Sequence, residues 1–504
     1  MAGTDTPGAA APPPEVVGEP RLLIDGKLVE ASEGTTFANI DPATEETLGD
    51  TADATPADME SAVGAARRAF DESTWAQDHV FRRRCLEQFH GALMAHREEL
   101  RNLVVAEVGS PMMLTYMMMV DGPIDDLGYW AEKPNQYEYE HWLPVREVFG
   151  QPQRRLIRRE PIGVVGAITP WNFPLYLNLA KLGPALAAGN TVVLKPAPDT
   201  PWSATFLGRL IAEETDIPAG VVNVVASSDH MVGEVLTTDP RVDMITFTGS
   251  TATGRRIMAK ASETVKKVFL ELGGKSANIV LEDADLASAV PISAMGVCTH
   301  SGQGCAITTR LLVHRSRYDE AVEMAKDSMA AVTYGDPWDP ANFQGPLISA
   351  TQRQRVLGYI EKGKAEGARL VCGGGVPAHL PKGYYVEPTL FADVDPKATI
   401  AQEEIFGPVL VMIPFDDDDD AVRIANDSIY GLSGAVTSAS EERALSVARR
   451  IRAGTLMVNG GLYNAPDVPF GGYRQSGLGR ENGTEGFEEY LEVKAMGLPG
   501  TAIA

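Results

Sequence analysis

The sequence predicts an α/β protein built on parallel sheets, and three observations lead to this class. Between Pro161 and Glu271, short apolar runs alternate with helical stretches, and a second block with the same alternation follows Gly274. Strands that alternate with helices form parallel sheets with helices on both faces. The length of 504 residues favours two or three domains over one small core.

The chain is expected to begin with a tail, a hairpin and two helices. Residues 1–20 are rich in alanine, proline and glycine and lack a basic leader, which is typical of a disordered tail. Asp25-Gly26 interrupts an alternating run and predicts a hairpin. Thr55 is placed to cap a helix that ends near residue 72. A second helix is expected over 82–109, with Cys85 packed on one of its faces.

The two alternating blocks divide into strands and helices. In the first block, strands are expected at 162–170, 191–197, 221–227, 243–250 and 266–272, with helices near 180–189, 203–215, 233–238 and 251–264. In the second block, strands are expected at 276–281, 308–314 and 454–461, and helices over 285–302, from 318 onward, and from 352 toward a strand that ends near 374.

Three further segments stand out by their charge or their isolation. Asp416 to Asp420 form an acidic run before a helical pattern; acid in a first turn complements the helix dipole, so a capped helix is expected there and not a metal site. Residues 141–161 are alternating and arginine-rich, and residues 486–496 are a lone strand-like run. We expect the last two to be exposed edge strands that another subunit covers.

The composition argues against several classes of protein. A formal net charge of −24 disfavours a nucleic-acid surface or an anionic membrane partner. Four cysteines without an apolar leader do not indicate a disulfide framework, and their spacing matches no zinc pattern, so no metal is expected. No apolar run reaches the roughly 18 residues typical of a membrane span. A reducing, cytoplasmic compartment is expected.

A glycine-containing turn follows one predicted strand. Gly249 and Gly254 have the spacing of a P-loop, but Arg255-Arg256 stand where lysine and serine or threonine are required, and the G-x-G-x-x-G fingerprint is absent. Small residues here would still let a diphosphate approach the N–H groups of a helix N-terminus. A plain glycine turn explains the pattern equally well.

Three polar side chains follow predicted strands, at the sheet edge where ligands bind in α/β proteins. Asn172 lies between Pro170 and Pro174, which would hold its amide still as a donor to an oxyanion; an ordinary turn asparagine is the alternative. Lys195 ends a strand and either faces a ligand or is solvated. Glu271 ends an apolar strand, where a raised pKa would suit a general base, unless the carboxylate reaches solvent.

Cys305 lies in a loop of small and polar residues, behind Gly302 and Gly304. This setting favours an exposed nucleophile whose own backbone N–H serves the oxyanion, although isolated cysteines are more often buried and inert. The surroundings match neither the caspase pattern nor the papain pattern, so a cysteine protease is disfavoured.

These features occur in an order that resembles the NAD(P)-dependent aldehyde dehydrogenases. The resemblance extends from Leu22 to Met496 and is carried by the motifs "TPWNFP", "GNTVVLKPAPDTP", "PAGVVNVV", "FTGST", "LELGGKS", "GQGC", "EEIFGPV", "YGL" and "PFGGYRQSGLGRE". It implies that the protein oxidises a small-molecule aldehyde to the carboxylic acid.

The resemblance implies a role for each catalytic residue. Cys305 would attack the aldehyde carbon, and the Asn172 amide and the Cys305 N–H would hold the resulting oxyanion. Oxidation would leave a thioester, and Glu271 would be the base for its hydrolysis. Members that pass the acyl group to coenzyme A often lack this base, so acylation of coenzyme A is an alternative, as is a silent binding protein on the same fold.

The resemblance also implies two sets of binding residues. The cofactor is expected to contact Lys195, Ser250, Glu404, Trp171, Thr169, Gly249, Phe406 and Gly254. The aldehyde pocket is expected to include Phe173, Thr299, His300, Asn464 and Phe470. Pro198 stands where many members have an acid that disfavours a 2′-phosphate, so NAD is expected and NADP is an alternative.

The implied architecture has two Rossmann-like parallel-sheet domains and a small β element. The cofactor-binding domain would comprise 21–138 and 160–272, and the catalytic domain 273–477. Residues 139–159 and 478–504 would form an oligomerisation element of a homodimer or homotetramer.

Overall fold

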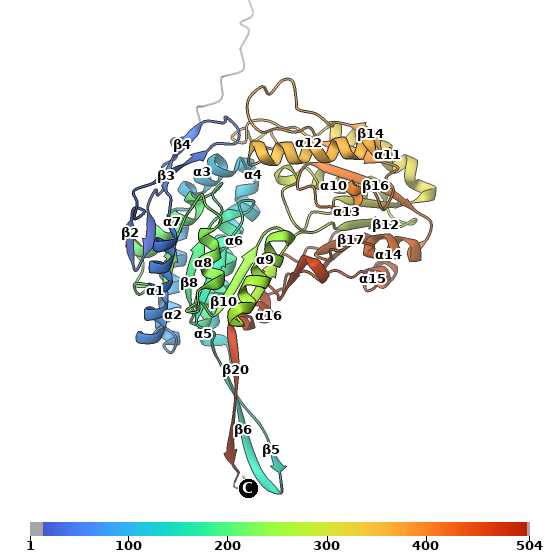
Figure 1. Ribbon diagram of the computed structural model, residues 1–504. Coiled ribbons are helices and arrows are strands. Elements are labelled where there is room, and N and C mark those ends of the chain that lie inside the picture. The colour runs from blue at the N-terminus through green and yellow to red at the C-terminus, as the bar shows by residue number, and fades with distance from the viewer. Residues whose placement is uncertain (1–13, 501–504) are drawn as a thin grey trace, which may run out of the picture.

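The computed structural model describes residues 14–500. Two lobes, each built on one sheet, are joined side by side, and a long β arm projects from the body (Figure 1). Of the tail expected over 1–20, residues 1–13 lie outside the described range. Glu19 is buried, and its carbonyl accepts a 2.6 Å hydrogen bond from the Thr205 hydroxyl. The chain therefore packs onto the body earlier than expected.

The first lobe is built on an eight-stranded sheet whose central strands are parallel. Its strand order is β19 (Gly477–Leu478), β11 (Lys267–Glu271), β10 (Met244–Thr248), β7 (Val164–Ile168), β8 (Thr191–Lys195), β9 (Val222–Val224), β1 (Leu22–Ile24) and β2 (Lys27–Val29). The pairs from β11 through β9 are parallel, and the edge strands pair antiparallel. The strands predicted over 162–272 are confirmed.

Helices cover both faces of this sheet. One face packs against α2 (His79–Ala95), α3 (Arg97–Val108), α5 (Asp121–Gln136), α6 (Pro174–Ala188) and α7 (Trp202–Glu214). The other face packs against α1 (Pro56–Glu72), α8 (Val232–Thr238) and α9 (Thr251–Ala261). Val165 and Val192 belong to the first core, and Val164 and Val193 belong to the second. Side chains alternate between the faces of a strand, so a strand between two helix layers must be apolar throughout.

The predicted hairpin and first helix are confirmed, and the second helix is divided. Asp25 and Gly26 have positive φ values of 51° and 72°, which suit a two-residue hairpin turn. Thr55 caps α1 in a capping box with Asp58. The helix expected over 82–109 ends at Ala95 and resumes at Arg97, because the intervening His96 leaves the helical conformation.

The second lobe is built on a seven-stranded sheet. Its order is β14 (Arg369–Cys372), β15 (Thr389–Ala392), β16 (Val409–Phe415), β13 (Arg310–His314), β12 (Ala277–Val280), β17 (Ser433–Thr437) and β18 (Thr455–Val458). Neighbours are parallel except β14 and β15. One face packs against α10 (Leu286–Gly296) and α11 (Tyr318–Ala330), and the other against α12 (Ala350–Ala365), α14 (Asp418–Asn426) and α15 (Glu441–Ala448).

Short elements connect these parts of the fold. They are a hairpin of β3 (Thr36–Ile40) and β4 (Thr47–Ala52), the helices α4 (Met112–Leu114), α13 (Thr399–Gln402) and α16 (Gly483–Glu488), the π-helical turn η1 (Thr115–Met119), and the 3-10 turns η2 (Ser262–Thr264), η3 (Thr299–Gly302), η4 (Arg315–Arg317) and η5 (Arg474–Ser476).

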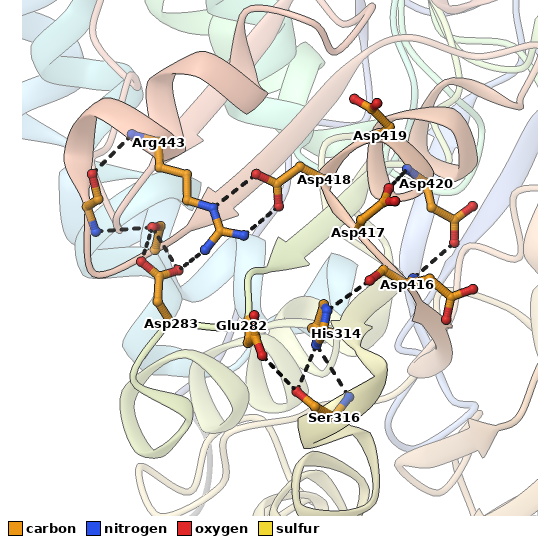
Figure 2. Close-up of polar contacts among 12 residues, drawn as sticks. Glu282, Asp283, His314, Ser316, Asp416, Asp417, Asp418, Asp419, Asp420 and Arg443 are labelled. Carbon is orange, nitrogen blue, oxygen red and sulfur yellow. Dashed lines mark hydrogen bonds and ion pairs between the residues drawn. The ribbon is translucent and has the colours of Figure 1, made fainter.

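The acidic run begins helix α14, as predicted. Asp417 is the N-cap, and its carboxylate accepts a 2.8 Å hydrogen bond from the Asp420 N–H. Figure 2 shows the Arg443 guanidinium between Asp418 and Asp283, which it contacts at 2.7 Å and 2.9 Å. The helix dipole and the Arg443 cation offset the mutual repulsion of the carboxylates.

Three antiparallel strands form the projecting arm (Figure 1). Their order is β20 (Leu491–Pro499), β6 (Gln151–Pro161) and β5 (Glu140–Val148). The arginine-rich segment is therefore a hairpin. The prediction of a strand over 486–496 is partly wrong, because helix α16 extends to Glu488 and β20 begins only at Leu491. The arm carries exposed apolar side chains, including Trp142, Phe149 and Val493.

One pairing crosses the domain boundaries expected from the sequence. Gly477 and Leu478, expected at the junction of the second domain and the oligomerisation element, instead pair with Glu271 and Leu270 of the first sheet. A strand of two residues has no periodic pattern, so the sequence could not indicate it.

Candidate active site

A large cleft lies at the carboxyl ends of β7, β8 and β10, bordered by the start of α12 in the second lobe. Its volume is about 710 Å³, within the range of small-molecule and cofactor sites. Among its lining residues are Thr169, Trp171, Lys195, Gly249, Ser250, Arg256, Ser349 and Gln352. Five of the residues predicted to bind the cofactor therefore share one cleft.

Lys195 is buried at the end of β8 on the cleft wall. Its ammonium donates a 3.3 Å hydrogen bond to the Ser227 carbonyl. Burial lowers the pKa of Lys195 to about 8, against the opposing effect of Asp229 and Asp53. The strand-end position predicted for this lysine is confirmed, and the side chain is not solvated.

In the turn before α9, the small residues Gly249 and Ser250 line the cleft. Ser250 is the N-cap, and its hydroxyl accepts a 3.2 Å hydrogen bond from the Thr253 N–H. Gly254 is not among the residues that line the cleft, and a Cβ there would lie 2.6 Å from Leu272 Cδ2. Gly254 lets α9 pack closely on the sheet.

Two further residues predicted to contact the cofactor, Glu404 and Phe406, are not in the cleft lining, but Phe406 contacts two residues that are, Trp171 and Gln352. The rings of Trp171 and Phe406 meet edge to face, with centroids 5.4 Å apart. Phe406 has a φ of 64°, which is strained for a bulky side chain. The Glu404 carboxylate accepts a 2.8 Å hydrogen bond from the Gly274 N–H, and burial raises the pKa of Glu404 to about 7. The Thr169 hydroxyl donates to Asn178 at 2.7 Å, which leaves it satisfied inside the protein.

The Asn172 amide is directed at the loop that carries Cys305. It is buried after β7 and donates a 2.9 Å hydrogen bond to the Gln303 carbonyl. An amide nitrogen carries two hydrogens, so one donor remains for another acceptor. Asn172 is therefore held beside the loop that carries Cys305, as the bracket of prolines predicts.

Glu271 lies close to the same loop, because the chain after β11 contacts Cys305 directly. A Cβ on Gly274 would lie 2.5 Å from the Cys305 carbonyl oxygen. Glu271 is buried, and neither of its carboxylate oxygens has a hydrogen-bond partner. Burial and then the Glu481 charge raise the pKa of Glu271 well above its ordinary value, while Lys181 and Arg480 oppose the shift.

Cys305 is half-buried, and its surroundings favour the neutral form of the thiol. Burial raises the pKa of this thiol, and the charges of Glu404, Glu271 and Glu481 raise it further. The loop is therefore less exposed than expected. A nucleophile in such a setting needs a nearby base to take its proton.

The predicted aldehyde-pocket residues are only partly brought together. Phe173 lies against His300, with ring centroids 5.1 Å apart, and Thr299 is half-buried in the same segment. His300 is fully buried with both ring nitrogens unpartnered, and burial lowers its pKa to about 4. Phe470 exchanges two backbone hydrogen bonds with Glu481. Asn464 is exposed, and among residues 14–500 no hydrogen bond joins its side chain to the other predicted pocket residues.

A buried ion pair behind Glu271 was not predicted. Lys181 of α6 and Glu481 are almost fully buried, and their Nζ and Oε1 atoms are 3.1 Å apart. Lys181 is the only charged residue in the mostly apolar helix 174–188, which is a signal that could have identified it. The partner Glu481 lies 300 positions away and could not be inferred.

Gly471 supports the position of Glu271, which leads to a prediction. A Cβ on Gly471 would lie 2.7 Å from Glu271 Oε1. We expect Gly471→Ala to displace this carboxylate and reduce steady-state turnover by roughly 10- to 100-fold, because small misplacements of a base are costly. Gly296→Ala is the control, since a Cβ there meets nothing within 4 Å. Equal turnover of the two variants would contradict the prediction.

Among residues 14–500, no helix combines the length and apolarity needed to cross a bilayer. Over the same range, no group of three or more histidine, cysteine, aspartate or glutamate side chains is arranged to hold a metal ion.

The protein therefore belongs to the α/β class and has a cleft large enough for a nucleotide, next to the half-buried thiol of Cys305. Residues 28–496 match the model of the aldehyde dehydrogenase family. A 3-succinoylsemialdehyde-pyridine dehydrogenase of a Pseudomonas species is 42% identical, with 95% of this chain and 99% of that protein covered.

Solved structures give the same result. An aldehyde dehydrogenase of Mycobacterium tuberculosis complexed with NAD+ is 44% identical over 96% of this chain and 99% of that one, with a TM-score of 0.92. A mutant of aldehyde dehydrogenase C of Pseudomonas syringae, complexed with NAD+ and octanal, is 40% identical over 95% and 96%, with a TM-score of 0.90. The chain belongs to the aldehyde dehydrogenase family.

Proposed function

We propose that this protein oxidises an aldehyde to a carboxylic acid with NAD+, with NADP+ as an alternative cofactor. The observation that carries the proposal is the convergence of Cys305, Asn172 and Glu271 beside the cleft. Relatives whose structures contain NAD+ support the choice of cofactor.

The cleft has the volume and the donors that a dinucleotide requires. N–H groups at the start of α9, next to Gly249 and Ser250, would hold the diphosphate, and Lys195 would bind the adenosine ribose. Glu404 would bind the nicotinamide ribose, between Phe406 and the Gly274 loop. Bound NAD+ supplies the two-electron oxidant for the reaction.

Cys305 and Glu271 would share the first chemical step. The sulfur forms a bond to the aldehyde carbon as its proton leaves, and Glu271, which lacks hydrogen-bond partners, can accept that proton. The free donor of Asn172 and the Cys305 N–H would stabilise the negative charge that develops on the aldehyde oxygen.

Glu271 would also complete the reaction. After oxidation the acyl group is held as a thioester on Cys305, and Glu271 would remove a proton from the water that attacks it. The carboxylic acid leaves and the thiol is restored. A base at this position favours hydrolysis over transfer to coenzyme A.

Steady-state assays with aliphatic, aromatic and carboxyl-bearing aldehydes, NAD+ or NADP+, and added coenzyme A test this function. We expect the carboxylic acid to form in proportion to reduced cofactor, without a requirement for coenzyme A. Strict dependence on coenzyme A would favour the acylating alternative. No cofactor reduction with any aldehyde would favour a silent binding protein.

The same proposal assigns a role to each domain and to the arm. Residues 21–138 and 160–272 would bind the cofactor, and 273–477 would carry the nucleophile in a cytoplasmic enzyme. The oligomerisation element expected over 139–159 and 478–504, which contains most of the arm, would join subunits into a homodimer or homotetramer.

The arm gives a testable prediction about assembly. Trp142 is 53% exposed on β5, a large apolar surface for a single chain. We expect Trp142→Asp to shift the protein to a smaller species in sedimentation equilibrium, because a charge would be buried at the contact. Val80→Asp, on an exposed position of α2, should leave the mass unchanged. A monomeric wild-type protein would refute the role of the arm.

A further inference from the structure

The segment between β4 and α1 is hydrogen-bonded to the turn that follows β9. The Asp53 carboxylate accepts hydrogen bonds of 2.9 Å from the Ser228 N–H and 2.6 Å from the Ser228 hydroxyl. The Ser227 hydroxyl lies 3.0 Å from the same carboxylate and 2.8 Å from the Ala54 carbonyl. The Ala54 N–H donates a 3.0 Å hydrogen bond to the Ala226 carbonyl. Asp53 therefore fixes a turn that lies far from it in the sequence.

This turn holds the ammonium group of Lys195. The Ser227 carbonyl accepts the 3.3 Å hydrogen bond from Lys195 Nζ, and among residues 14–500 the ammonium has no other hydrogen-bond partner. The stem of Lys195 lies against α8, since a Cβ on Gly233 would be 3.0 Å from Lys195 Cδ. The position of the ammonium thus depends on Ser227, and the position of Ser227 depends on Asp53.

Asp53 also acts on Lys195 through its charge. Burial alone would raise the pKa of Asp53, but hydrogen bonds from Ser228 and Ser227 and the Lys195 charge lower it, so the carboxylate is ionised at neutral pH. The charges of Asp229 and Asp53 in turn oppose the effect of burial on Lys195. The two carboxylates therefore favour the cationic form of the buried lysine, which is the stronger donor.

We propose that Asp53 is a positioning residue of the cofactor site: it holds the Ser227 turn, and through it the Lys195 ammonium, where the adenosine ribose of NAD+ requires a donor. Asp53 is not among the residues that line the cleft, so it acts without contacting the cofactor. The inference rests on the proposed function, which assigns that ribose to Lys195.

Binding of NADH to the full-length protein, followed by fluorescence, tests this role. Asparagine offers one acceptor oxygen where the carboxylate offers two, so Asp53→Asn leaves a donor of the turn without its acceptor. We expect the Kd for NADH at neutral pH to rise about three- to tenfold, the effect of one lost hydrogen bond. KM for NAD+ should rise with it, while kcat and KM for the aldehyde change by less than about twofold. Asp50→Asn, at an exposed position of β4, is the matched control and should bind NADH as the wild type does.

The pH dependence of NADH binding separates the charge of Asp53 from a structural effect. Affinity should fall as the pH rises through the Lys195 pKa of about 8, because the ammonium loses its charge. Asp53→Asn removes a charge that raises this pKa, so the fall should begin at lower pH. Asp53→Glu keeps the charge and should retain the wild-type midpoint, and Lys195→Gln should lack the fall. The remaining charged groups near Lys195 or in the cleft lining are the same in all these variants: Asp229, Asp199, His230, Glu234, Arg256 and Lys260.

The outcomes distinguish this inference from the proposed function. A wild-type Kd and midpoint in Asp53→Asn would overturn the inference alone, and so would equal rises in KM for NAD+ and for the aldehyde. Absence of NADH and NADPH binding to the wild-type protein would instead overturn the proposed function. If Asp53→Asn fails to fold, Ser228→Ala removes the 2.6 Å hydrogen bond and keeps both charges, so it should weaken NADH binding without moving the midpoint. Unchanged binding by that variant would then overturn the inference.

Discussion

Cys305→Ala is expected to lose aldehyde oxidation almost completely. Without sulfur no covalent adduct forms, and the loss in kcat should be of the order of 10⁵-fold or more, as for other nucleophile deletions. Cofactor binding should persist, because the cleft is lined by residues of β7, β8, β10 and α9 and does not include Cys305. Turnover is measured from the appearance of reduced cofactor, and binding by calorimetry.

Cys372→Ala is the matched control for this variant. Cys372 is the other half-buried cysteine, on the edge strand β14, whereas Cys85 and Cys298 are buried. The control should retain full activity, and alkylation that inactivates the protein should map to Cys305. Substantial oxidation by Cys305→Ala would remove the thiol from the mechanism.

Glu271→Gln is expected to arrest the reaction after oxidation. Glutamine has nearly the shape of glutamate but cannot accept a proton, so steady-state turnover should fall by about 10²- to 10⁴-fold. Acyl-enzyme should accumulate and be visible by mass spectrometry as an adduct on Cys305. Glu263→Gln, at an exposed position in η2, should show neither effect.

The pH dependence of hydrolysis provides a second readout for Glu271. The carboxylate acts as a base only when ionised, and its pKa is raised well above the ordinary value. The wild-type rate should therefore rise with pH through this elevated pKa and level off above it. Glu271→Gln should lack this rise. A wild-type rate independent of pH, or no trapped acyl group in the variant, would assign the base to another residue.

Local patterns were enough to predict much of the fold. Short apolar runs between helical stretches identified β7, β8, β10 and β11, because strands between two helix layers are apolar on both faces. Thr55 and the acidic run at 416–420 each marked a helix start through capping and the dipole. Local patterns failed where no period existed, as in the two-residue strand β19, and where His96 interrupted a helical run.

Parts of the site could also be predicted from the sequence, but their electrostatics could not. Because Asn172, Lys195 and Glu271 each follow or end a predicted strand, the sequence placed them at the sheet edge where ligands bind. An exposed thiol was expected at Cys305, yet the side chain is half-buried, and burial and nearby carboxylates raise its pKa. Gly254 has the spacing of a phosphate loop, but it serves close packing against Leu272.

Short-range patterns and ordered motifs are enough to identify the fold class, the family and the residue types available for chemistry. Which of those residues meet depends on the folded chain, which brings the Gly274 loop against Cys305 and sets Glu481 beside Glu271. Such contacts join positions hundreds of residues apart, and the pKa values that govern the chemistry depend on burial and on neighbouring charges that arise only when the chain is folded.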